Sequence, residues 1–422
     1  MSSIKIQGGK PLIGSVAISG AKNASLPILT ACLLIKGVTQ LYNVPDIGDI
    51  RTMLRILQCI GVKITKGEQE GSLLIDATKV NGDADLSEAE KIRGSQTLLS
   101  TMLNRCGEVR LPPLGGCNIG TRQMDLHINS LQRLGADFTM EQGWIHMKTT
   151  GLKGSTIYLD YSSVGATENA ILASCLAEGN TIIENAAQEP EIVDLINFLN
   201  KAGAKIFGLG SKTIRVVGVK TLKSNHYHRI MPDRIEAGSF MIAAVMTHGD
   251  LVITNMSVAD NSSLVYKLKE IGATVDVIGQ DSVHVRMKKR PHSFQIKTMP
   301  YPGFPTDLQS PMMALACIAD GVSVIVENVF ENRFQVAREL SKMGAKIVTS
   351  EKVATVFGTS GLTPATVVSP DLRGGMSLVL AALSIPEFSV IEAFEKVNRG
   401  YDRFQQKLTS LGVKIINQED FA

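Results

Sequence analysis

The stretch PPLGGCNIGTRQMDLH places a cysteine and an arginine in a segment rich in glycine. Two glycines precede Cys117 and Gly120 follows it, so this backbone can adopt conformations that are closed to other residues. A nearby cation such as Arg122 stabilises a thiolate and makes a cysteine reactive. Cys117 is therefore a candidate nucleophile or acid, and the alternative is a small apolar side chain buried in a loop.

Charged or polar residues stand directly before six apolar segments, each long enough for a helix. Free N–H groups at a helix start favour an anion, and arginine can bind phosphate or carboxylate through two parallel hydrogen bonds. Asp307 among such cations would stay ionised and could act as a base. Each residue alone could simply cap its helix, but the six positions together favour a cleft that binds several anions. The residues are Lys22 and Asn23, Arg93, Glu168 and Asn169, Asp233 and Arg234, Asp307, and Asp371 and Arg373.

Composition narrows the class of protein. The 422 residues, 44% of them hydrophobic, predict two or three ordered globular domains. A net charge of +3 is too small to indicate nucleic acid or an anionic membrane as a partner. The sequence contains neither a signal-peptide pattern nor an apolar run of about 20 residues for a membrane span, so we expect a cytoplasmic protein.

Cysteine usage also fits a cytoplasmic protein, and histidine usage bears on whether a metal is bound. The six cysteines contain no CxxC pair, which fits a reducing compartment without disulfides, and we expect the five outside the glycine-rich loop to be buried. The seven histidines are scattered, so we expect no metal site. Nothing in the sequence indicates a cofactor.

A short signature recurs six times along the chain. Each copy has an apolar residue, a glycine, a small residue, a polar residue and an apolar residue, and the copies are about 70 residues apart. Each follows an amphipathic helical pattern, so we expect the glycine to end a helix in the left-handed conformation. The glycines are Gly61, Gly135, Gly203, Gly272, Gly344 and Gly412.

The rest of each repeat can be predicted from periodicity. A segment that is apolar nearly all round predicts a buried helix, and a β-branched strand follows it, as in KGVTQLYNV and DGVSVIVEN. One repeat is therefore a strand, a buried helix, a strand, an amphipathic helix and further strands. Six such α/β units predict a pseudo-symmetric assembly and not a doubly wound sheet, but the pattern does not say how the six are divided between domains.

A second set of charged residues opens the amphipathic segments. If the repeats face one another, these side chains could reach the same cleft as the first set. His127 lies one helical turn into its segment, where we expect a surface or helix-face residue and not a catalyst. The charged residues are Arg122 and Asp125, Glu189 and Glu191, Arg333, and Arg399.

Several long blocks in a fixed order make the chain similar to a known family. The blocks are SGAKNASLPIL (19–29), LGGCNIGTRQMDLH (114–127), SVGATEN (163–169), EGNTIIENAAQEPEIVDL (178–195), PDRIEAGSF (232–240), YPGFPTDLQSPMMAL (301–315), VFENRF (329–334), DLR (371–373) and NRGY (398–401). With these blocks the chain resembles, over essentially its whole length, the UDP-N-acetylglucosamine 1-carboxyvinyltransferases of the EPSP synthase superfamily.

The resemblance implies a two-domain inside-out α/β barrel built from the six repeats. One domain would span residues 22–230 and carry the Cys117 loop as a lid. The other would be discontinuous, with residues 1–21 and 231–422, because the N-terminal strand completes it. The substrates would bind between the two domains.

The implied reaction transfers the enolpyruvyl group of phosphoenolpyruvate to the 3′-hydroxyl of UDP-N-acetylglucosamine and releases phosphate, as the first committed step of peptidoglycan precursor synthesis. The resemblance makes Cys117 the acid, and also the residue that fosfomycin would alkylate, while Asp307 is the base toward the sugar hydroxyl. Lys22 and Arg399 complete the implied catalytic set. Phosphoenolpyruvate would contact Lys22, Asn23, Arg93, Arg122, Arg373, Arg399 and Asp371. The nucleotide sugar would contact Asn23, Arg93, Asp125, Leu126, Ser163, Val164, Gly165, Asp307 and Val329, with Glu189, Asp233 and Glu236 as further candidates.

Three other functions stay open on the sequence. The first is the shikimate-pathway enolpyruvyl transferase, against which the cysteine loop and the uridine-side blocks argue. The second is a paralogue for another nucleotide sugar, which the departures Asn118 and Gln123 keep open. Asn398, before Arg399, is a further departure that bears on substrate affinity. The third is a sensor without catalysis, but binding alone needs neither an acid nor a base.

Overall fold

The computed structural model describes residues 2–115, 119–120, 124–224 and 226–417. This part of the chain forms two compact units. Unit 1 contains residues 2–19, 119–120 and 232–417, and unit 2 contains residues 20–115, 124–224 and 226–231. Each unit has its own cluster of buried apolar side chains.

Unit 1 has three four-stranded sheets, each with one parallel and two antiparallel pairings. The first consists of β17 (Gln295–Lys297), β18 (Val322–Val326), β20 (Val353–Phe357) and β19 (Lys346–Ser350). The second consists of β15 (Thr274–Ile278), β16 (Ser282–Arg286), β14 (Asp250–Thr254) and β2 (Ile13–Ala17). The third consists of β21 (Thr366–Val368), β22 (Phe388–Glu392), β1 (Ser3–Gln7) and β23 (Lys414–Asn417).

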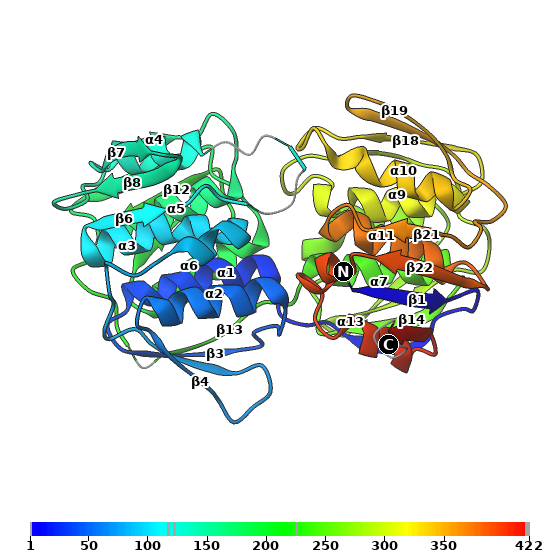
Figure 1. Ribbon diagram of the computed structural model, residues 1–422, viewed down its shortest axis with the longest axis horizontal. Helices are drawn as coiled ribbons and strands as arrows, with labels where there is room; N and C mark the ends of the chain where they lie inside the picture. The colour runs from blue at the N-terminus through cyan, green and yellow to red at the C-terminus, as the bar shows by residue number, and fades with distance from the viewer. Residues whose placement is uncertain (1, 116–118, 121–123, 225, 418–422) are drawn as a thin grey trace. The chain divides into compact units, whose positions relative to one another are not determined.

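Three apolar helices fill the interior of unit 1, inside the sheets (Figure 1). They are α7 (Arg234–Met246), α9 (Gln309–Ile318) and α11 (Leu372–Leu383), which pack against one another. Every residue of α9 and α11 is buried. Such helices need an interior position because they are apolar on all sides. The remaining helices are α8 (Ser262–Glu270), α10 (Val336–Lys342), α12 (Glu395–Asn398) and α13 (Phe404–Ser410).

Unit 2 repeats this plan. Its first sheet consists of β11 (Lys205–Phe207), β12 (Thr213–Val217), β10 (Asn180–Glu184) and β9 (Thr156–Tyr158). The second consists of β13 (His226–Arg229), β3 (Val38–Tyr42), β5 (Leu73–Asp76) and β4 (Lys63–Lys66). The third consists of β6 (Glu108–Leu111), β8 (Trp144–Lys148) and β7 (Asp137–Glu141). The apolar helices are α1 (Lys22–Ala31), α3 (Leu98–Cys106) and α5 (Val164–Ser174). The amphipathic helices are α2 (Gly48–Cys59), α4 (Asp125–Arg133) and α6 (Pro190–Lys201).

All six repeat glycines have the predicted left-handed backbone, with φ between +86° and +103°. Each follows the last turn of an amphipathic helix, and at Gly135 and Gly412 an added Cβ would meet nothing within 4 Å. The requirement for glycine at these two positions is therefore conformational and not one of space. The prediction of six helix-ending glycines is confirmed.

Two strands, β2 and β13, pair with strands that are far from them in the sequence. β2 pairs in parallel with β14, so Ile13 stands opposite Asp250, and β13 pairs in parallel with β3, so His226 stands opposite Thr39. The chain thus leaves unit 1 after Ser19 and, apart from residues 119–120, returns to it at Pro232. Each exchanged strand supplies the parallel partner that precedes a buried helix in the other repeats.

Two of the predicted buried cysteines are exposed. Cys32, Cys175 and Cys317 are buried as expected, and burial raises the pKa of each thiol to about 12. Cys59 and Cys106 are exposed because each is the last residue of its helix, where the apolar face ends. In the described part of the chain, no helix is long and apolar enough to cross a membrane.

Candidate functional site

Asp307 lies at the centre of a buried ion-pair cluster in unit 1. It belongs to the short 3-10 turn Thr306–Leu308, which leads directly into α9. Arg333 donates to Oδ1 of Asp307 at 2.6 Å, and Arg373 donates to Oδ2 at 2.9 Å. The two arginine side chains are 3% and 4% exposed, whereas that of Asp307 is 24% exposed. Each carboxylate oxygen has a second lone pair, so Asp307 can still accept a proton from its open side.

Arg373 is held charged although it is fully buried. Burial by itself lowers the pKa of this guanidinium, but the charge of Asp307, with smaller contributions from Tyr401 and Asp233, raises it above its ordinary value. The guanidinium also lies 5.3 Å from the centre of the Tyr401 ring. Arg373 is therefore a permanent cation next to the candidate base.

Two N–H groups of this cluster have no acceptor within the described residues. They are Nη1 of Arg373 and Nε of Arg333, and both are buried. An unpaired buried donor is costly, so these groups are suited to an anionic ligand such as a carboxylate or phosphate. Sequence reasoning gave Arg333 only as a residue that could reach the cleft, and its position before an amphipathic helix was the available signal.

Asp371 flanks the same cluster, and Arg399 follows a helix that packs against α11. Oδ1 of Asp371 caps α11 by accepting hydrogen bonds from the backbone N–H groups of Arg373 and Gly374, and it lies 4.0 Å from Nη1 of Arg333. Asp371 thus fixes the backbone that carries Arg373. Arg399 is half-buried and follows α12, which packs against α11.

Part of the glycine-rich loop lies against the segment that carries Arg333. The backbone N–H of Asn332 donates to the carbonyl of Ile119 at 3.0 Å, and an added Cβ at Gly120 would come within 2.0 Å of Glu331 Oε2. The other predicted residues of this loop, Cys117 and Arg122, lie outside the described residues, as do Asn118 and Gln123.

The first helix of unit 2 begins with two predicted ligands. Lys22 and Asn23 are the first residues of α1, and no side chain caps this helix start. Its first N–H groups therefore point outward without a side-chain acceptor, which suits an anion. Nζ of Lys22 lies 3.5 Å from Oδ2 of Asp49, and both side chains are largely buried. Asp49 carries no signal in the sequence beyond its place in the first turn of α2.

Three helix starts converge around Gly165 in unit 2. A Cβ at Gly165 would lie 2.0 Å from Nε2 of Gln96 and 2.9 Å from Cε1 of His127, so only glycine fits. These neighbours come from the 3-10 turn Arg93–Thr97 and from α4. Six of the nine predicted nucleotide-sugar contacts lie at these starts: Arg93, Asp125, Leu126, Ser163, Val164 and Gly165.

His127 is buried on the face of α4 that packs against α5, so of the two expected positions the helix face is correct and the surface is wrong. Its side chain is 4% exposed, and its Nδ1 lies 2.8 Å from the amide nitrogen of Asn169 on α5. Ser163 caps α5 by accepting from the N–H of Ala166 at 3.4 Å. His127 thus ties α4 to α5 at the point where the predicted ligands meet.

Glu168 is a buried carboxyl group in the same unit. Burial, followed by the charges of Glu191 and Glu189, raises its pKa well above the ordinary value, which favours the neutral form. The two neighbours open α6, as predicted. A neutral Glu168 can donate a hydrogen bond, which a carboxylate cannot.

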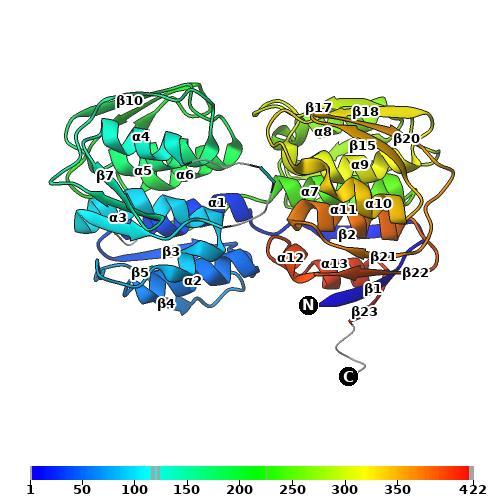
Figure 2. The ribbon, with the colours of Figure 1, turned by 45° about the horizontal axis from the view of Figure 1, so that its top comes forward.

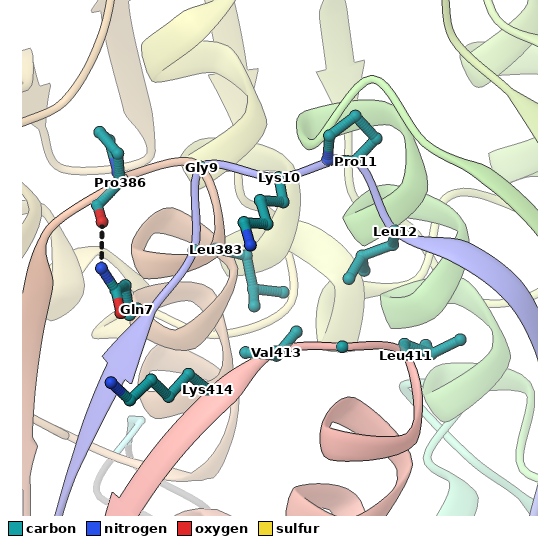
Figure 3. Close-up of a pocket in the computed structure, with 12 residues that line it drawn as sticks. Gln7, Gly9, Lys10, Pro11, Leu12, Leu383, Pro386, Leu411, Val413 and Lys414 are labelled. Carbon is teal, nitrogen blue, oxygen red and sulfur yellow. Dashed lines mark hydrogen bonds between the residues drawn. The ribbon is translucent and has the colours of Figure 1, made fainter.

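A cavity of about 240 Å³ lies elsewhere in unit 1 (Figure 3). Apolar side chains such as Leu12, Leu383 and Leu411 line it, with Lys10 and Lys414 at its edge. Its wall is held by a hydrogen bond from the Gln7 amide to the carbonyl of Pro386. None of the predicted site residues lines this cavity, so it has no part in the candidate site.

The fold and the charged helix starts define an enolpyruvyl transferase architecture, and comparisons with known proteins agree. The model of the EPSP synthase family (3-phosphoshikimate 1-carboxyvinyltransferase) matches residues 6–408. The solved structure of the enolpyruvyl transferase NikO from Streptomyces tendae superposes with a TM-score of 0.89 over 99% of both chains. At 24% identity, this likeness bears on the fold alone.

Curated relatives resolve the family further. UDP-N-acetylglucosamine 1-carboxyvinyltransferase 2 of Carboxydothermus hydrogenoformans is 46% identical over 100% of both chains. UDP-N-acetylglucosamine 1-carboxyvinyltransferase of Geobacter metallireducens is 45% identical over 98% of this chain and 99% of its own. The chain belongs to the EPSP synthase family and, within it, to the UDP-N-acetylglucosamine 1-carboxyvinyltransferases.

Proposed function

We propose that the protein transfers the enolpyruvyl group of phosphoenolpyruvate to the 3′-hydroxyl of UDP-N-acetylglucosamine and releases phosphate. The observation that carries this proposal is the carboxylate of Asp307 held between two buried arginines that keep further N–H groups for an anion. A base toward a hydroxyl and permanent cations for carboxylate and phosphate are what this reaction needs. The names of relatives at 45–46% identity support the acceptor.

The reaction has an addition and an elimination. In the addition, the sugar oxygen bonds to carbon 2 of phosphoenolpyruvate, Asp307 takes the hydroxyl proton, and Cys117 gives a proton to carbon 3. In the elimination, the Cys117 thiolate takes a proton back from carbon 3, the bond from carbon 2 to the phosphate oxygen breaks, and the double bond forms again. The proton held by Asp307 leaves with the phosphate. Arg333 and Arg373 would bind the carboxylate of phosphoenolpyruvate, while Lys22, Arg93, Arg122 and Arg399 would hold its phosphate.

The nucleotide sugar is assigned to the helix starts around Gly165. Gly165 lies close to Gln96 and His127, so the predicted sugar contacts on three segments of the chain lie at one place, which supports this assignment. Asp307 and Val329, which belong to unit 1, are kept as contacts of the sugar on the family resemblance alone. Cys117 is also proposed as the residue that fosfomycin alkylates, which rests on the family resemblance and on the position of Ile119 and Gly120 beside Glu331 and Asn332.

A direct assay separates the candidate functions. The purified protein is incubated with phosphoenolpyruvate and, in separate reactions, UDP-N-acetylglucosamine, UDP-N-acetylgalactosamine or shikimate 3-phosphate. We expect phosphate release and a product heavier by one enolpyruvyl group with UDP-N-acetylglucosamine. Turnover with shikimate 3-phosphate alone would make the chain a shikimate-pathway enzyme, and nucleotide-sugar binding without turnover would make it a sensor.

A further inference from the structure

Glu327 is a buried carboxylate that accepts four hydrogen bonds and forms no ion pair with a described residue. It directly follows β18, which pairs with β17 (Figure 2), and it is 2% exposed. Oε1 accepts from Thr298 Oγ1 at 2.8 Å and from the backbone N–H groups of Val329 and Phe330 at 2.8 and 3.1 Å. Oε2 accepts from Thr306 Oγ1 at 2.9 Å.

Three of these bonds involve residues that stand next to or near Asp307 and Arg333 in the chain, namely Thr306, Val329 and Phe330. Thr306 directly precedes Asp307 in the turn that leads into α9. On the other side, the guanidinium of Arg333 lies 5.2 Å from the centre of the Phe330 ring. One carboxylate therefore fixes the segment that carries the candidate base and the segment that carries its arginine.

Three other repeats have an asparagine at the position that Glu327 occupies in the repeat of Asp307. Glu327 stands six residues after Gly321, and the residues six after Gly37, Gly179 and Gly249 are Asn43, Asn185 and Asn255. Each of these asparagines has φ between +53° and +58°. Each donates its side-chain amide to a carbonyl next to the parallel strand, namely that of Ile230, Leu159 and Ile18.

Glu327 does not share the left-handed conformation of these asparagines. Asn328, the next residue, takes over the bond from a side-chain amide to the carbonyl of Thr298, at 3.1 Å. The turn is therefore still tied to its parallel strand without Glu327. An asparagine amide that donates one hydrogen bond has been replaced at this position by a carboxylate that gathers four donors.

We propose that Glu327 is a positioning residue that holds Asp307 in register with Arg333 and fixes the backbone of Val329. It touches no substrate, and it acts through Thr306 and through the N–H groups of Val329 and Phe330. The proposal rests on the proposed function, since it assumes that Asp307 is the base. A displacement of about 1 Å at a catalytic group can lower turnover about 100-fold, so loss of this anchor is expected to lower kcat more than it changes KM.

Three variants test the anchor in the intact protein. Glu327→Ala removes all four acceptor contacts, and we expect kcat to fall about 100-fold. Thr306→Val removes only the bond toward Asp307 and should give a smaller fall in kcat. Glu327→Gln can still accept from Thr298, Val329 and Phe330 with its oxygen and donate to the Thr306 hydroxyl, so it should restore most of the lost turnover.

The control is Asn255→Ala, which removes the equivalent turn contact from another repeat of unit 1. Alanine is compatible with this backbone, because Ala393 holds the same position in repeat six with φ +53°. Asn255→Ala should lower the melting temperature and leave kcat near wild type. A double variant Glu327→Ala/Thr306→Val should lose no more turnover than Glu327→Ala, because both changes break the same link.

Thermal unfolding and nucleotide-sugar binding are measured for each variant, and the conservative Thr306→Val keeps the test valid if Glu327→Ala does not fold. Wild-type kcat in Thr306→Val and in the folded Glu327 variants would overturn the proposal, and so would an equal loss of kcat in Asn255→Ala. Failure of the proposed function is separate, because the wild-type protein would then release no phosphate with UDP-N-acetylglucosamine.

Discussion

Arg333 donates a 2.6 Å hydrogen bond to Asp307 across 26 positions of the chain. Each residue lies in a 3-10 turn directly before a helix, α9 for Asp307 and α10 for Arg333. The second oxygen of Asp307 is held by Arg373, the second residue of α11 in the next repeat. Three helix starts therefore set the orientation of one carboxylate.

Asp307→Asn is predicted to remove the base while keeping the shape of the side chain. The new amide group must face one of the two guanidinium groups, so one hydrogen bond becomes a contact between two donors. We expect kcat to fall about 100- to 10,000-fold, the usual contribution of a general base, with nucleotide-sugar binding retained. Steady-state phosphate release and calorimetric binding check this.

Asp320→Asn is the matched control for this change. Asp320 also pairs with an arginine, Arg290, but both side chains are exposed, 69% and 40% respectively. Its loss should leave kcat unchanged, since exposed ion pairs contribute little. Near-normal turnover of Asp307→Asn would show that another group accepts the hydroxyl proton.

Arg333→Lys is predicted to weaken phosphoenolpyruvate binding. Arg333 donates to Asp307 through Nη2, while its Nε–H has no acceptor within the described residues. A lysine keeps the charge, but its single ammonium group cannot replace both of these separate donors. Loss of one charge-assisted hydrogen bond is expected to raise KM for phosphoenolpyruvate about 10- to 100-fold. Arg338→Lys, at an exposed position of α10, is the control and should behave like wild type. An unchanged KM in Arg333→Lys would remove Arg333 from the anion site.

Gly165→Ala is predicted to disturb the nucleotide-sugar site. Because the new methyl group would come within 2.0 Å of Gln96 Nε2 and 2.9 Å of His127 Cε1, these side chains must move. Overpacking of this kind costs about 1–3 kcal/mol, and we expect a higher Kd for UDP-N-acetylglucosamine and a lower melting temperature. Gly361→Ala, where nothing lies within 4 Å of the added group, is the control. Wild-type affinity in Gly165→Ala would place the sugar elsewhere.

The repeats could be predicted from the sequence because their signals are local. A left-handed glycine after an amphipathic helix, and an apolar helix before a β-branched strand, depend on residues within about a dozen positions. Periodicity could not predict that β2 pairs with β14 and that β13 pairs with β3. By pattern alone, β2 and β13 are equally suitable as the parallel partner of β14 or of β3.

The charged residues of the site could be predicted from the sequence, but the contacts between their side chains could not. Asp307 and Arg373 stand out because each is a charged residue at the start of a buried helix. The burial of His127 could not be predicted because its partner, Asn169, lies in another repeat. Glu327 has no signal at all, since a glutamate after a strand is ordinarily a solvated residue, and only the positions of Thr298 and Thr306 reveal its role.

Fosfomycin is predicted to inactivate the enzyme by alkylating Cys117. The thiolate attacks the epoxide carbon, the carbon–oxygen bond opens, and the oxygen takes a proton. Cys117→Asp keeps an ionisable acid and should stay active while becoming resistant, whereas Cys117→Ala should lose most turnover. Peptide mass spectrometry locates the adduct, with exposed Cys59 and Cys106 as internal controls. An adduct on either control, or a fully active Cys117→Ala, would contradict the acid role.

Glu236 is predicted to make stability depend on pH. Burial raises the pKa of this carboxyl to about 7, although Lys407 and the backbone N–H of Ser19 act in the opposite direction. The folded protein therefore holds a proton that the unfolded chain has already lost between the ordinary pKa of 4.5 and pH 7. The contribution of Glu236 is fully present below pH 4.5 and falls as pH rises to 7, by about 3 kcal/mol at most.

Glu236→Gln removes this titration and keeps a side chain of the same shape. Urea unfolding at pH 5, 6, 7 and 8 should show the free energy of unfolding of the wild-type protein falling more steeply between pH 5 and 7 than that of Glu236→Gln. The difference arises because glutamine has no carboxyl proton to release over this pH range. Parallel curves for the two proteins would mean that the Glu236 carboxyl titrates at its ordinary pKa in the folded state.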